Sequence, residues 1–264
     1  GRAIQNMLNI DADDKVNAFI RVKQLQDPEY NMSHNLLFCT RKGVIKKTKL
    51  EAYSRPRQNG VNAITIREDD QVIQVRLTTG DSQIIMANKH GRAIRFHEST
   101  VREMGRTATG VRGMTLDETG DDEVIGMICI KDPEKETVMV VSEQGYGKRS
   151  EIEDYRITNR GGKGVKTLNI TEKTGNLVAI KSVTDENDLV IINKSGITLR
   201  MKVADVRIMG RATQGVRLIN LEKRNDEIAS VCKVLSETES DSSNSENIDS
   251  SSEMNEVEAS ETTE

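Results

Sequence analysis

The amino-acid sequence repeats itself about every 50 residues, and this period limits the fold more than any other feature. Gly-Val pairs stand at residues 60–61, 110–111, 164–165 and 215–216, at spacings of 50, 54 and 51. A second glycine keeps the same period in TRKGVIKK (Gly43), NKHGRAIR (Gly91), SEQGYGKR (Gly145) and NKSGITLR (Gly196). The phrases MGRTATGVRG (104–113) and MGRATQGVRL (209–218) are two units apart. Such a period is typical of an array of units that pack on their neighbours.

Each unit is expected to fold into short strands. The second full unit contains the β-branched segments NAITI (62–66), QVIQVRL (71–77), QIIMAN (83–88) and RAIRFHE (92–98), separated by short polar stretches. Four strands in a unit of this length outline a propeller blade, with the turn glycines at positive φ in hairpin loops. The sequence therefore predicts an all-β domain over residues 1–235, with blades at about 1–56, 57–104, 105–158 and 159–209 and a partial blade at 210–235.

An acidic tail follows the repeats. Residues 236–264 hold ten Asp or Glu and no Lys, Arg or aromatic residue, which predicts disorder. Without the tail, the balance of 38 basic against 42 acidic residues becomes 38 against 32, so the repeats carry +6 and the tail −10. The net charge of −4 for the whole chain therefore hides a mildly basic body.

The apolar runs are as short as strands. LLFC (36–39), VMVV (138–141) and LVII (189–192) are far from the roughly 18 residues of a membrane span, so we expect a soluble cytoplasmic protein with no membrane partner. The chain opens on Gly1 without a signal-peptide pattern, as a fragment would. Three scattered cysteines, Cys39, Cys129 and Cys232, predict reduced core thiols.

Lysine and arginine recur at two places in each unit, the strand after the turn glycine and the connecting loop. The strand positions are Lys46, Lys47, Lys49, Arg92, Arg95, Lys148, Arg149, Arg200 and Lys202. The loop positions are Arg55, Arg57, Arg102, Arg106, Arg112, Arg156, Arg160, Lys163, Lys166, Arg207, Arg211 and Arg217. Because equivalent positions of successive blades lie at the same height around an axis, we expect a discontinuous basic belt along the edge of the array.

A belt of this kind suits the phosphate backbone of a bent DNA duplex, since each basic cluster binds phosphates and releases counterions. Recognition is expected by shape and charge, because aromatic residues make up only 3% of the chain and no Asn/Gln-rich recognition helix is visible. The alternative is that the charged residues, 30% of the chain, simply solvate the surface.

Catalytic and cofactor motifs are not found. His34, His90 and His97 have no metal or triad spacing with Cys or carboxylates, which predicts ordinary turn or surface histidines. The glycines of RGGKG (160–164) precede a predicted strand rather than a helix, so they do not form a P-loop. We expect no catalytic residue, metal ligand or cofactor in this chain.

The repeated MGRxxxGVR, the segments GYGKRSEIEDY (145–155) and HGRAIRFHESTVREMG (90–105) and the acidic tail resemble the C-terminal domain of the DNA gyrase A protein. The resemblance covers essentially all of residues 1–235. It implies a β-pinwheel, a propeller-like ring of about six four-stranded blades with its own strand topology. It also implies that duplex DNA wraps round a basic rim.

In the complete enzyme, the resemblance implies, wrapping presents a neighbouring DNA segment to the cleavage gate, and ATP-driven strand passage introduces negative supercoils. The catalytic tyrosine would lie in an N-terminal domain outside this chain, and ATP and Mg would be bound elsewhere, ATP by the gyrase B protein. This chain alone is then no enzyme. The implied partners are duplex DNA, the gyrase B protein and a second gyrase A protein.

The resemblance also identifies an expected motif that is missing. Family members carry a box resembling QRRGGxG in the first blade, and this sequence begins after that place. TNRGGKGV (158–165) is either a degenerate relative of the box or a plain linker. Full wrapping is expected to be weak, and residues 210–235 to lack strand partners. The tail either competes with DNA for the belt or solubilises the chain.

Two other interpretations remain open. The C-terminal domain of the topoisomerase IV A protein is a related, usually shorter or broken pinwheel, although the even repeat and the tail favour gyrase. A propeller that serves as a protein-interaction platform is the second, although the chain has no Trp and thus no Trp-Asp signature. An enzymatic propeller would need acids or histidines converging on the axis.

Overall fold

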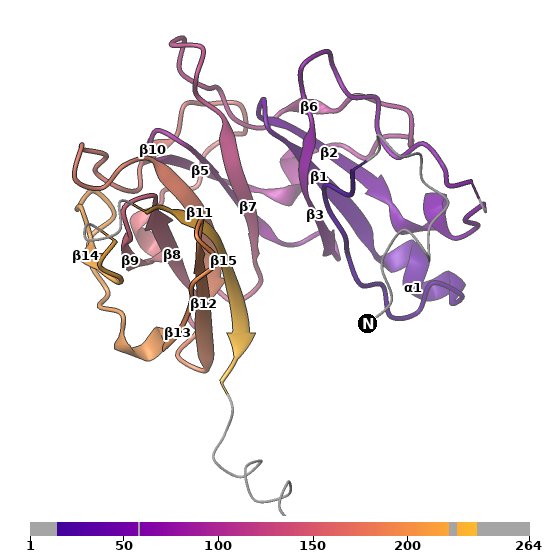
Figure 1. Ribbon diagram of the computed structural model, residues 1–264. Coiled ribbons are helices and arrows are strands. Elements are labelled where there is room, and N and C mark those ends of the chain that lie inside the picture. The colour runs from indigo at the N-terminus through magenta and orange to yellow at the C-terminus, as the bar shows by residue number, and fades with distance from the viewer. Residues whose placement is uncertain (1–14, 58, 222–225, 237–264) are drawn as a thin grey trace, which may run out of the picture.

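The computed structural model describes residues 15–57, 59–221 and 226–236, which form four small antiparallel sheets in chain order (Figure 1). Each sheet is built on a hairpin that carries one of the four turn glycines. The hairpins are β1 (Asn35–Thr40) with β2 (Val44–Lys49), β4 (Gln83–Asn88) with β5 (Arg92–His97), β8 (Thr137–Ser142) with β9 (Tyr146–Glu151), and β12 (Asn187–Asn193) with β13 (Thr198–Lys202). The predicted all-β, propeller-like array is confirmed.

Two further strands join each hairpin. A long strand pairs with the first hairpin strand: β3 (Val72–Thr78), β7 (Val124–Ile130), β11 (Leu177–Val183) and β15 (Ile228–Leu235). A two-residue strand that begins at the valine of a Gly-Val pair joins the second hairpin strand: β6 (Val111–Arg112), β10 (Val165–Lys166) and β14 (Val216–Arg217). The resulting orders are β3-β1-β2-β6, β10-β5-β4-β7, β11-β8-β9-β14 and β13-β12-β15, named sheets A to D below.

The two-residue strands lace neighbouring sheets together. After β5 of sheet B, the chain runs to the edge of sheet A, adds β6 there, and returns to sheet B as β7. Strand β10 links sheet C to sheet B in the same way, and β14 links sheet D to sheet C. Each sheet therefore contains residues from two successive repeats.

This lacing corrects the predicted blade boundaries. Residues 62–66 form no strand, and β3 pairs with β1 of sheet A rather than with the hairpin that follows it. Of the four strands predicted in the unit 57–104, only the hairpin β4–β5 stays together. The sequence of a segment can indicate that it is extended, but it does not identify the strand with which the segment pairs, because pairing depends on non-local packing.

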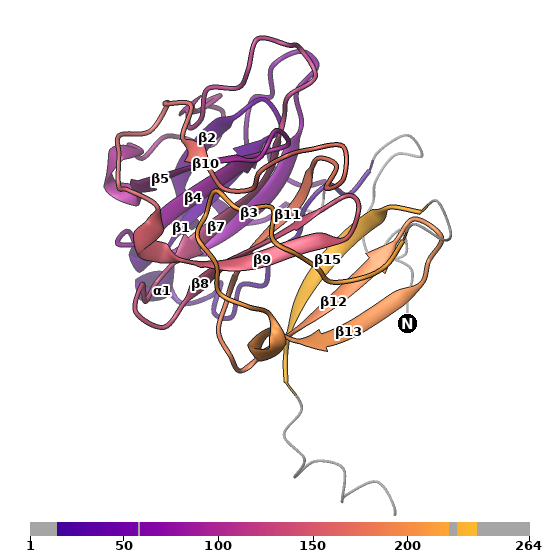
Figure 2. The ribbon, with the colours of Figure 1, turned by 90° about the vertical axis from the view of Figure 1, so that its left-hand side faces the viewer.

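The expectation that residues 210–235 lack partners is wrong. Strand β14 pairs with β9, and β15 pairs with β12. The incomplete element is the outer edge of β13, which has no neighbouring strand among the described residues (Figure 2). The opening phrase of the chain and, apart from Ser236, the predicted acidic tail lie outside the described residues.

Short helices follow the strands. Four 3-10 helices continue directly from the second strand of each hairpin: η2 (Leu50–Tyr53), η3 (Glu98–Thr100), η4 (Ile152–Asp154) and η5 (Val203–Asp205). The α-helix α1 (Pro28–Ser33) begins with Pro28 and is capped by Asp27, whose carboxylate accepts from the Glu29 amide at 2.9 Å. No helix in the described part of the chain has the length and apolar character needed to cross a bilayer.

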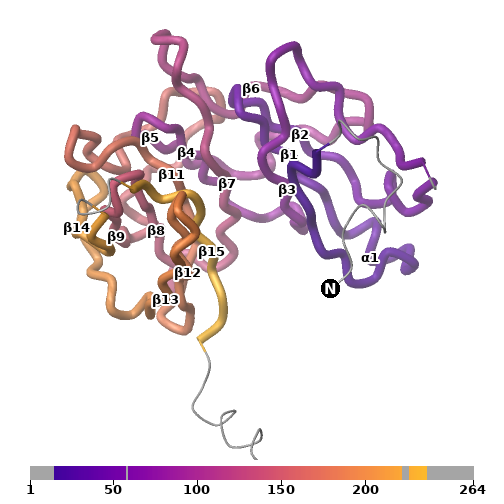
Figure 3. Tube along the Cα trace, in the orientation of Figure 1, coloured from indigo at the N-terminus to yellow at the C-terminus, as the bar shows by residue number. Residues whose placement is uncertain are grey.

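The hydrophobic core lies between successive sheets. Strands β3, β7, β11 and β15 follow one another through the centre of the molecule, where β7 contacts β3 and β11, and β11 contacts β15 (Figure 3). Residues Ile84 and Met86 of β4 pack in the cluster toward sheet A, whereas Ile85 and Ala87 pack in the cluster toward sheet C. A strand buried on both faces explains why the apolar runs are continuous rather than alternating.

Candidate nucleic-acid interface

Three long loops carry ten of the 21 residues of the predicted basic belt. They run from the 3-10 helices to the two-residue strands, over residues 101–112, 155–166 and 206–217, and are named the outer loops below. The first basic residue in each outer loop is Arg102, Arg156 or Arg207, and all three are exposed. Each lies eleven residues after its turn glycine, so the repeat positions an exposed guanidinium near the start of each outer loop.

A second exposed cation ends each outer loop. Arg112, Lys166 and Arg217 are the second residues of β6, β10 and β14, which form the outer edges of sheets A to C. Arg217 donates to the Tyr146 hydroxyl at 2.9 and 3.1 Å and lies over the Tyr146 ring. The outer edge of three successive sheets is therefore basic at equivalent positions.

The third recurring arginine holds the outer loop in place. Arg160 donates from Nε to the Thr100 carbonyl oxygen at 2.9 Å and from Nη1 to the Arg112 carbonyl oxygen at 3.0 Å. Arg211 repeats this geometry with the carbonyl oxygens of Asp154 and Lys166, at 3.0 and 2.9 Å. These half-buried side chains tie each outer loop to the preceding one, and only part of each guanidinium faces solvent.

The corresponding arginine in the first outer loop has a different environment. Arg106 lines a surface recess of about 550 Å³ together with Arg55 and Arg57, both exposed. The Glu51 side chain lines the same recess. Three arginines and one glutamate therefore line the same surface recess, which leaves a local excess of positive charge there.

Five of the predicted DNA-binding residues are buried, and the structure gives them another role. Lys47, Arg95 and Arg149 occupy the same place in β2, β5 and β9 and are at most 6% exposed. Each donates to the first backbone carbonyl oxygen of the 3-10 helix in the next sheet: Lys47 to Glu98 at 3.3 Å, Arg95 to Ile152 at 2.8 Å and Arg149 to Val203 at 3.2 Å. The recurrence of cations here reflects sheet-to-sheet bonding, and a phosphate cannot reach them.

Lys46 and Lys148 are the other two buried cations, both with no exposed surface. The Lys148 ammonium donates to the Gly210 carbonyl oxygen at 2.6 Å, and the Lys46 ammonium donates to the carbonyl oxygens of Ala63 and Arg106. Burial lowers the pKa of each lysine from 10.5 to about 8. Each ammonium group therefore binds the backbone of an outer loop from the buried side.

The remaining predicted residues are divided between exposed and partly engaged positions. Lys49 forms an ion pair with Glu103 at 3.1 Å, and Arg92 donates to the carbonyl oxygens of Lys163 and Gly164 at 3.1 and 2.9 Å. Lys163, Arg200 and Lys202 are exposed. In sheet D, Arg200 occupies the place of the buried arginines but donates instead to the Asp188 carboxylate at 2.8 Å.

One cluster of titratable groups forms in the fold from residues that are apart in the sequence. His90 Nδ1 lies 3.4 Å from a carboxylate oxygen of Asp117 and 3.8 Å from one of Asp122, and its Nε2 lies 3.4 Å from Asp121. Asp122 is already bound by the Asn88 side-chain amide at 2.6 Å and the Asp117 backbone amide at 3.0 Å. Sequence spacing did not suggest the cluster because the hairpin turn and the loop before β7 come together only in the fold.

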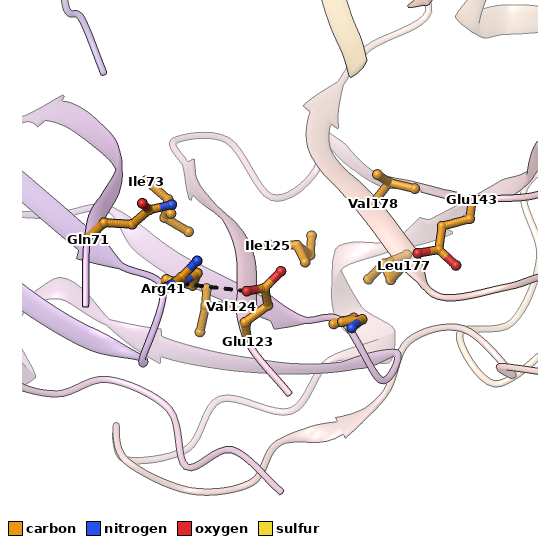
Figure 4. Close-up of a pocket in the computed structure, with 10 residues that line it drawn as sticks. Arg41, Gln71, Ile73, Glu123, Val124, Ile125, Glu143, Leu177 and Val178 are labelled. Atoms are coloured by element: carbon orange, nitrogen blue, oxygen red, sulfur yellow. Dashed lines mark ion pairs between the residues drawn. The ribbon is translucent and has the colours of Figure 1, made fainter. Parts of the chain in front are cut away.

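A cleft of about 300 Å³ lies among the ends of the central strands (Figure 4). Two acids, Glu123 and Glu143, and two cations, Arg41 and Lys89, line it with apolar residues of β3, β7 and β11. Glu123 pairs with Arg41 at 3.6 Å, and Glu143 accepts from the Asn176 amide at 2.8 Å. Both carboxylates are engaged by protein groups, so this cleft offers little to an acid–base reaction.

The fold is that of a propeller-like pinwheel domain. Its neighbouring sheets are joined by two-residue strands, and the hairpins are followed by 3-10 helices and basic loops. The family described as "DNA gyrase C-terminal domain, beta-propeller" matches residues 34–79, 82–131, 136–184 and 187–232, one segment for each hairpin. The four segments make up well over half of the chain, and the chain belongs to this family.

Curated relatives agree with the family match. The DNA gyrase A protein of Staphylococcus aureus (strain NCTC 8325 / PS 47) is 44% identical over 246 residues, which cover 93% of this chain and 27% of the relative. The same protein from strain MRSA252 is 46% identical over 221 residues, or 84% of this chain and 24% of the relative. The chain therefore spans about a quarter of the length of the relatives it matches.

Two solved structures share the fold. The C-terminal domain of DNA topoisomerase IV superposes with a TM-score of 0.80 at 26% identity, covering 89% of this chain and 71% of that one. The DNA gyrase A C-terminal domain superposes with a TM-score of 0.77 at 25% identity, covering 89% and 75%. The two TM-scores are close, so the fold alone does not separate the gyrase domain from the topoisomerase IV domain.

Proposed function

We propose that this chain binds duplex DNA along its outer loops and bends it. The observation that supports the proposal is the recurrence of exposed cations at two equivalent positions in three successive outer loops: Arg102, Arg156 and Arg207, then Arg112, Lys166 and Arg217. Evenly repeated cations on a curved array match the repeated phosphates of a bent duplex better than they match a compact ligand.

The burial pattern refines the proposed DNA contacts. Exposed residues contact phosphates directly: Arg55, Arg57, Arg102, Arg112, Arg156, Lys163, Lys166, Arg200, Lys202, Arg207 and Arg217. The half-buried Lys49, Arg92, Arg106, Arg160 and Arg211 contribute long-range charge. The buried Lys46, Lys47, Arg95, Lys148 and Arg149 position the outer loops and join the sheets, as described above.

In the complete enzyme, this domain is the DNA-wrapping part of a type IIA topoisomerase. We assign ATP-dependent negative supercoiling to an assembly of two gyrase A and two gyrase B proteins, with the catalytic tyrosine, ATP and Mg in other parts of it. The domain itself acts without a cofactor and in the cytoplasm. Membership of the gyrase C-terminal family and the likeness to the gyrase A protein support this assignment.

The proposal is tested by titrating the full chain with a linear duplex of about 60 base pairs across 50 to 200 mM salt, with end-to-end FRET as the measure of bending. The exchange R102Q/R156Q/R207Q is expected to reduce the salt slope by about 3, because each lost phosphate contact removes about one released counterion. The control K23Q/K131Q/K135Q removes three exposed lysines outside the outer loops and is expected to leave the slope nearly unchanged.

Each outcome of this titration is informative. Salt-sensitive binding with the ends drawn together supports a domain that bends DNA. Salt-sensitive binding with unmoved ends supports a DNA-binding surface that does not bend the duplex. The absence of binding, or equal effects of the two triple variants, contradicts the outer loops as the interface.

A further inference from the structure

Two large apolar side chains project from the basic outer loops. Ile157 is 56% exposed and Ile208 is 45% exposed, and each directly follows an exposed arginine, Arg156 or Arg207. Isoleucine is among the residues most often buried, and a single exposed one needs no explanation. Here the same exposed position recurs in two successive repeats, within the cationic segment itself.

The backbone holds both isoleucines outward. Ile157 forms a parallel bridge with Arg95 of β5, where the amide of Thr158 donates to the Arg95 carbonyl oxygen at 2.9 Å. Ile208 bridges Arg149 of β9 in the same way, with the amide of Met209 donating to the Arg149 carbonyl oxygen at 2.8 Å. Because Arg95 and Arg149 are themselves buried, these side chains stand on a rigid support.

The fold does not require an apolar residue at this place. In the first outer loop the equivalent residue is Glu103, which forms the same backbone bridge with Lys47 and pairs with Lys49 through its side chain. An acidic residue is therefore compatible with the bridge. The isoleucines of the next two loops are explained neither by the bridge nor by core packing.

We propose that Ile157 and Ile208 enter the minor groove of the bound duplex and partly unstack one base step each. This inference rests on the proposed DNA-binding function and adds how the bend is produced. Apolar wedges of this kind kink duplexes in minor-groove architectural proteins, where flanking cations bind the phosphates on both sides. The exposed Arg156 and Arg207 directly precede the two isoleucines and bind the adjacent phosphates. Arg160 and Arg211, three residues after the isoleucines, are engaged with backbone carbonyl oxygens and add long-range positive charge.

A protein partner is a poorer fit to the same surface. Protein interfaces have a continuous apolar centre from which charged residues are depleted. Each isoleucine is instead a single apolar side chain among arginines, separated from the other by the length of one repeat. DNA presents such an alternation of charged backbone and apolar base faces at every step.

The test compares I157A/I208A with the wild-type full chain in the same FRET titration. Removing the wedges is expected to return the end-to-end distance at saturation most of the way to that of free DNA, while affinity falls by no more than about tenfold. The salt slope stays unchanged, because no cation is lost. The arginine triple variant described above is expected to show the reverse pattern, a reduced salt slope with more of the bend retained per bound complex.

Two further variants serve as controls. I157L/I208L keeps an apolar side chain and is expected to retain the bend, and equal urea unfolding of all variants excludes a folding defect. Glu103→Ile adds a third apolar side chain at the equivalent place and is expected to bring the ends closer than in the wild-type complex.

Several results would overturn the inference. An unchanged bend in I157A/I208A removes the wedge, and so does a loss of salt slope in that variant, since it would mean that the isoleucines only support the arginines. Normal bending combined with lost binding to the other gyrase proteins would assign the isoleucines to a protein contact. Failure of the wild-type chain to bind DNA would instead contradict the proposed function itself.

Discussion

Arg149 illustrates how a cation can join two sheets of a repeat protein. Its guanidinium donates to the Val203 carbonyl oxygen at 3.2 Å and to Thr137 Oγ1 at 3.1 Å, and pairs with Asp185 at 2.7 Å. Arg149→Met is expected to lower the free energy of unfolding by about 3 kcal/mol, because buried acceptors lose their donor. Urea unfolding measures this loss.

Arg200→Met is the matched control for this prediction. Arg200 occupies the same place in sheet D, but its side chain is 41% exposed and donates to the Asp188 carboxylate. We expect a loss of about 1 kcal/mol there, since water replaces much of what is removed. Equal losses in the two variants would refute the sheet-to-sheet role of Arg149.

Lys148 predicts a pH dependence of stability. Burial lowers the pKa of its ammonium from 10.5 to about 8 in the folded chain. Between these two values the unfolded chain binds the extra proton, so stability rises with pH. From pH 7.5 to 9.5, the unfolding free energy of the wild type relative to Lys148→Met is expected to rise by about 1 to 2 kcal/mol. Parallel urea-unfolding profiles of the two proteins over this range would contradict the prediction.

At the residue scale, the sequence identified the recurring cations, but the prediction that all of them face DNA was wrong for the five that are buried. A regular series of Lys and Arg is expected both for a belt that faces phosphates and for side chains that bind backbone carbonyl oxygens of the next sheet. Arg95 and Arg156 are indistinguishable by residue type and period, and only the first is buried. Burial of a strand's second face depends on the neighbouring sheet, which no local pattern specifies.

At the scale of the hairpin, turn glycines meet two demands. Gly145 has a φ of +76°, and a Cβ at this position would lie 2.7 Å from the Ile219 carbonyl oxygen of the returning chain. Gly196 has a φ of +87° but no atom within 4 Å of the same place. Gly196→Ala is expected to cost about 1 kcal/mol for the positive φ alone, and Gly145→Ala about 3 kcal/mol or more, because a backbone atom must also move.

Thermal or urea unfolding of the two alanine variants checks this difference. Equal destabilisation would mean that only the positive φ matters and that the chain between β14 and β15 can move aside. The sequence predicted the hairpin role of these glycines correctly from local turn chemistry. It did not show the close approach, because Ile219 is far along the chain from Gly145.

The difference between local signals and long-range contacts also explains which strands were predicted correctly. The hairpins have a glycine at the turn, an apolar strand before it and a short strand with recurring cations after it, so local signals identify both strands and their pairing. Residues 62–66 have a strand-like composition, yet they run as irregular chain beneath the first outer loop, where the Thr65 amide donates to the Ala108 carbonyl oxygen at 3.3 Å. The two-residue strands are too short for any periodic signal.

Across the whole molecule, the pairing of each two-residue strand with the neighbouring sheet determines how the exposed cations are spaced. Each outer loop belongs to one sheet by sequence and to its neighbour by pairing, so the exposed cations of successive repeats are rigidly spaced. A ligand that binds one outer loop therefore meets the next at a fixed distance. This arrangement favours an extended polyanion over a small one.

The acidic tail is the other charged part of the molecule. Removing residues 237–264 takes away all ten of its acidic groups and changes the net charge of the chain from −4 to +6. If the tail competes with DNA for the outer loops, DNA affinity at 50 mM salt is expected to rise by about tenfold, and the gain is expected to shrink toward 200 mM as salt screens both interactions.

A tail of equal length with its Asp and Glu replaced by Asn and Gln separates charge from bulk. If charge is responsible, this variant binds DNA as tightly as the truncated chain, because both have lost the competing carboxylates. A truncation that leaves affinity unchanged at both salt concentrations would instead assign the tail to solubility alone. The measurement is the FRET titration used for the outer loops, so a shift in affinity is read against the bend in the same sample.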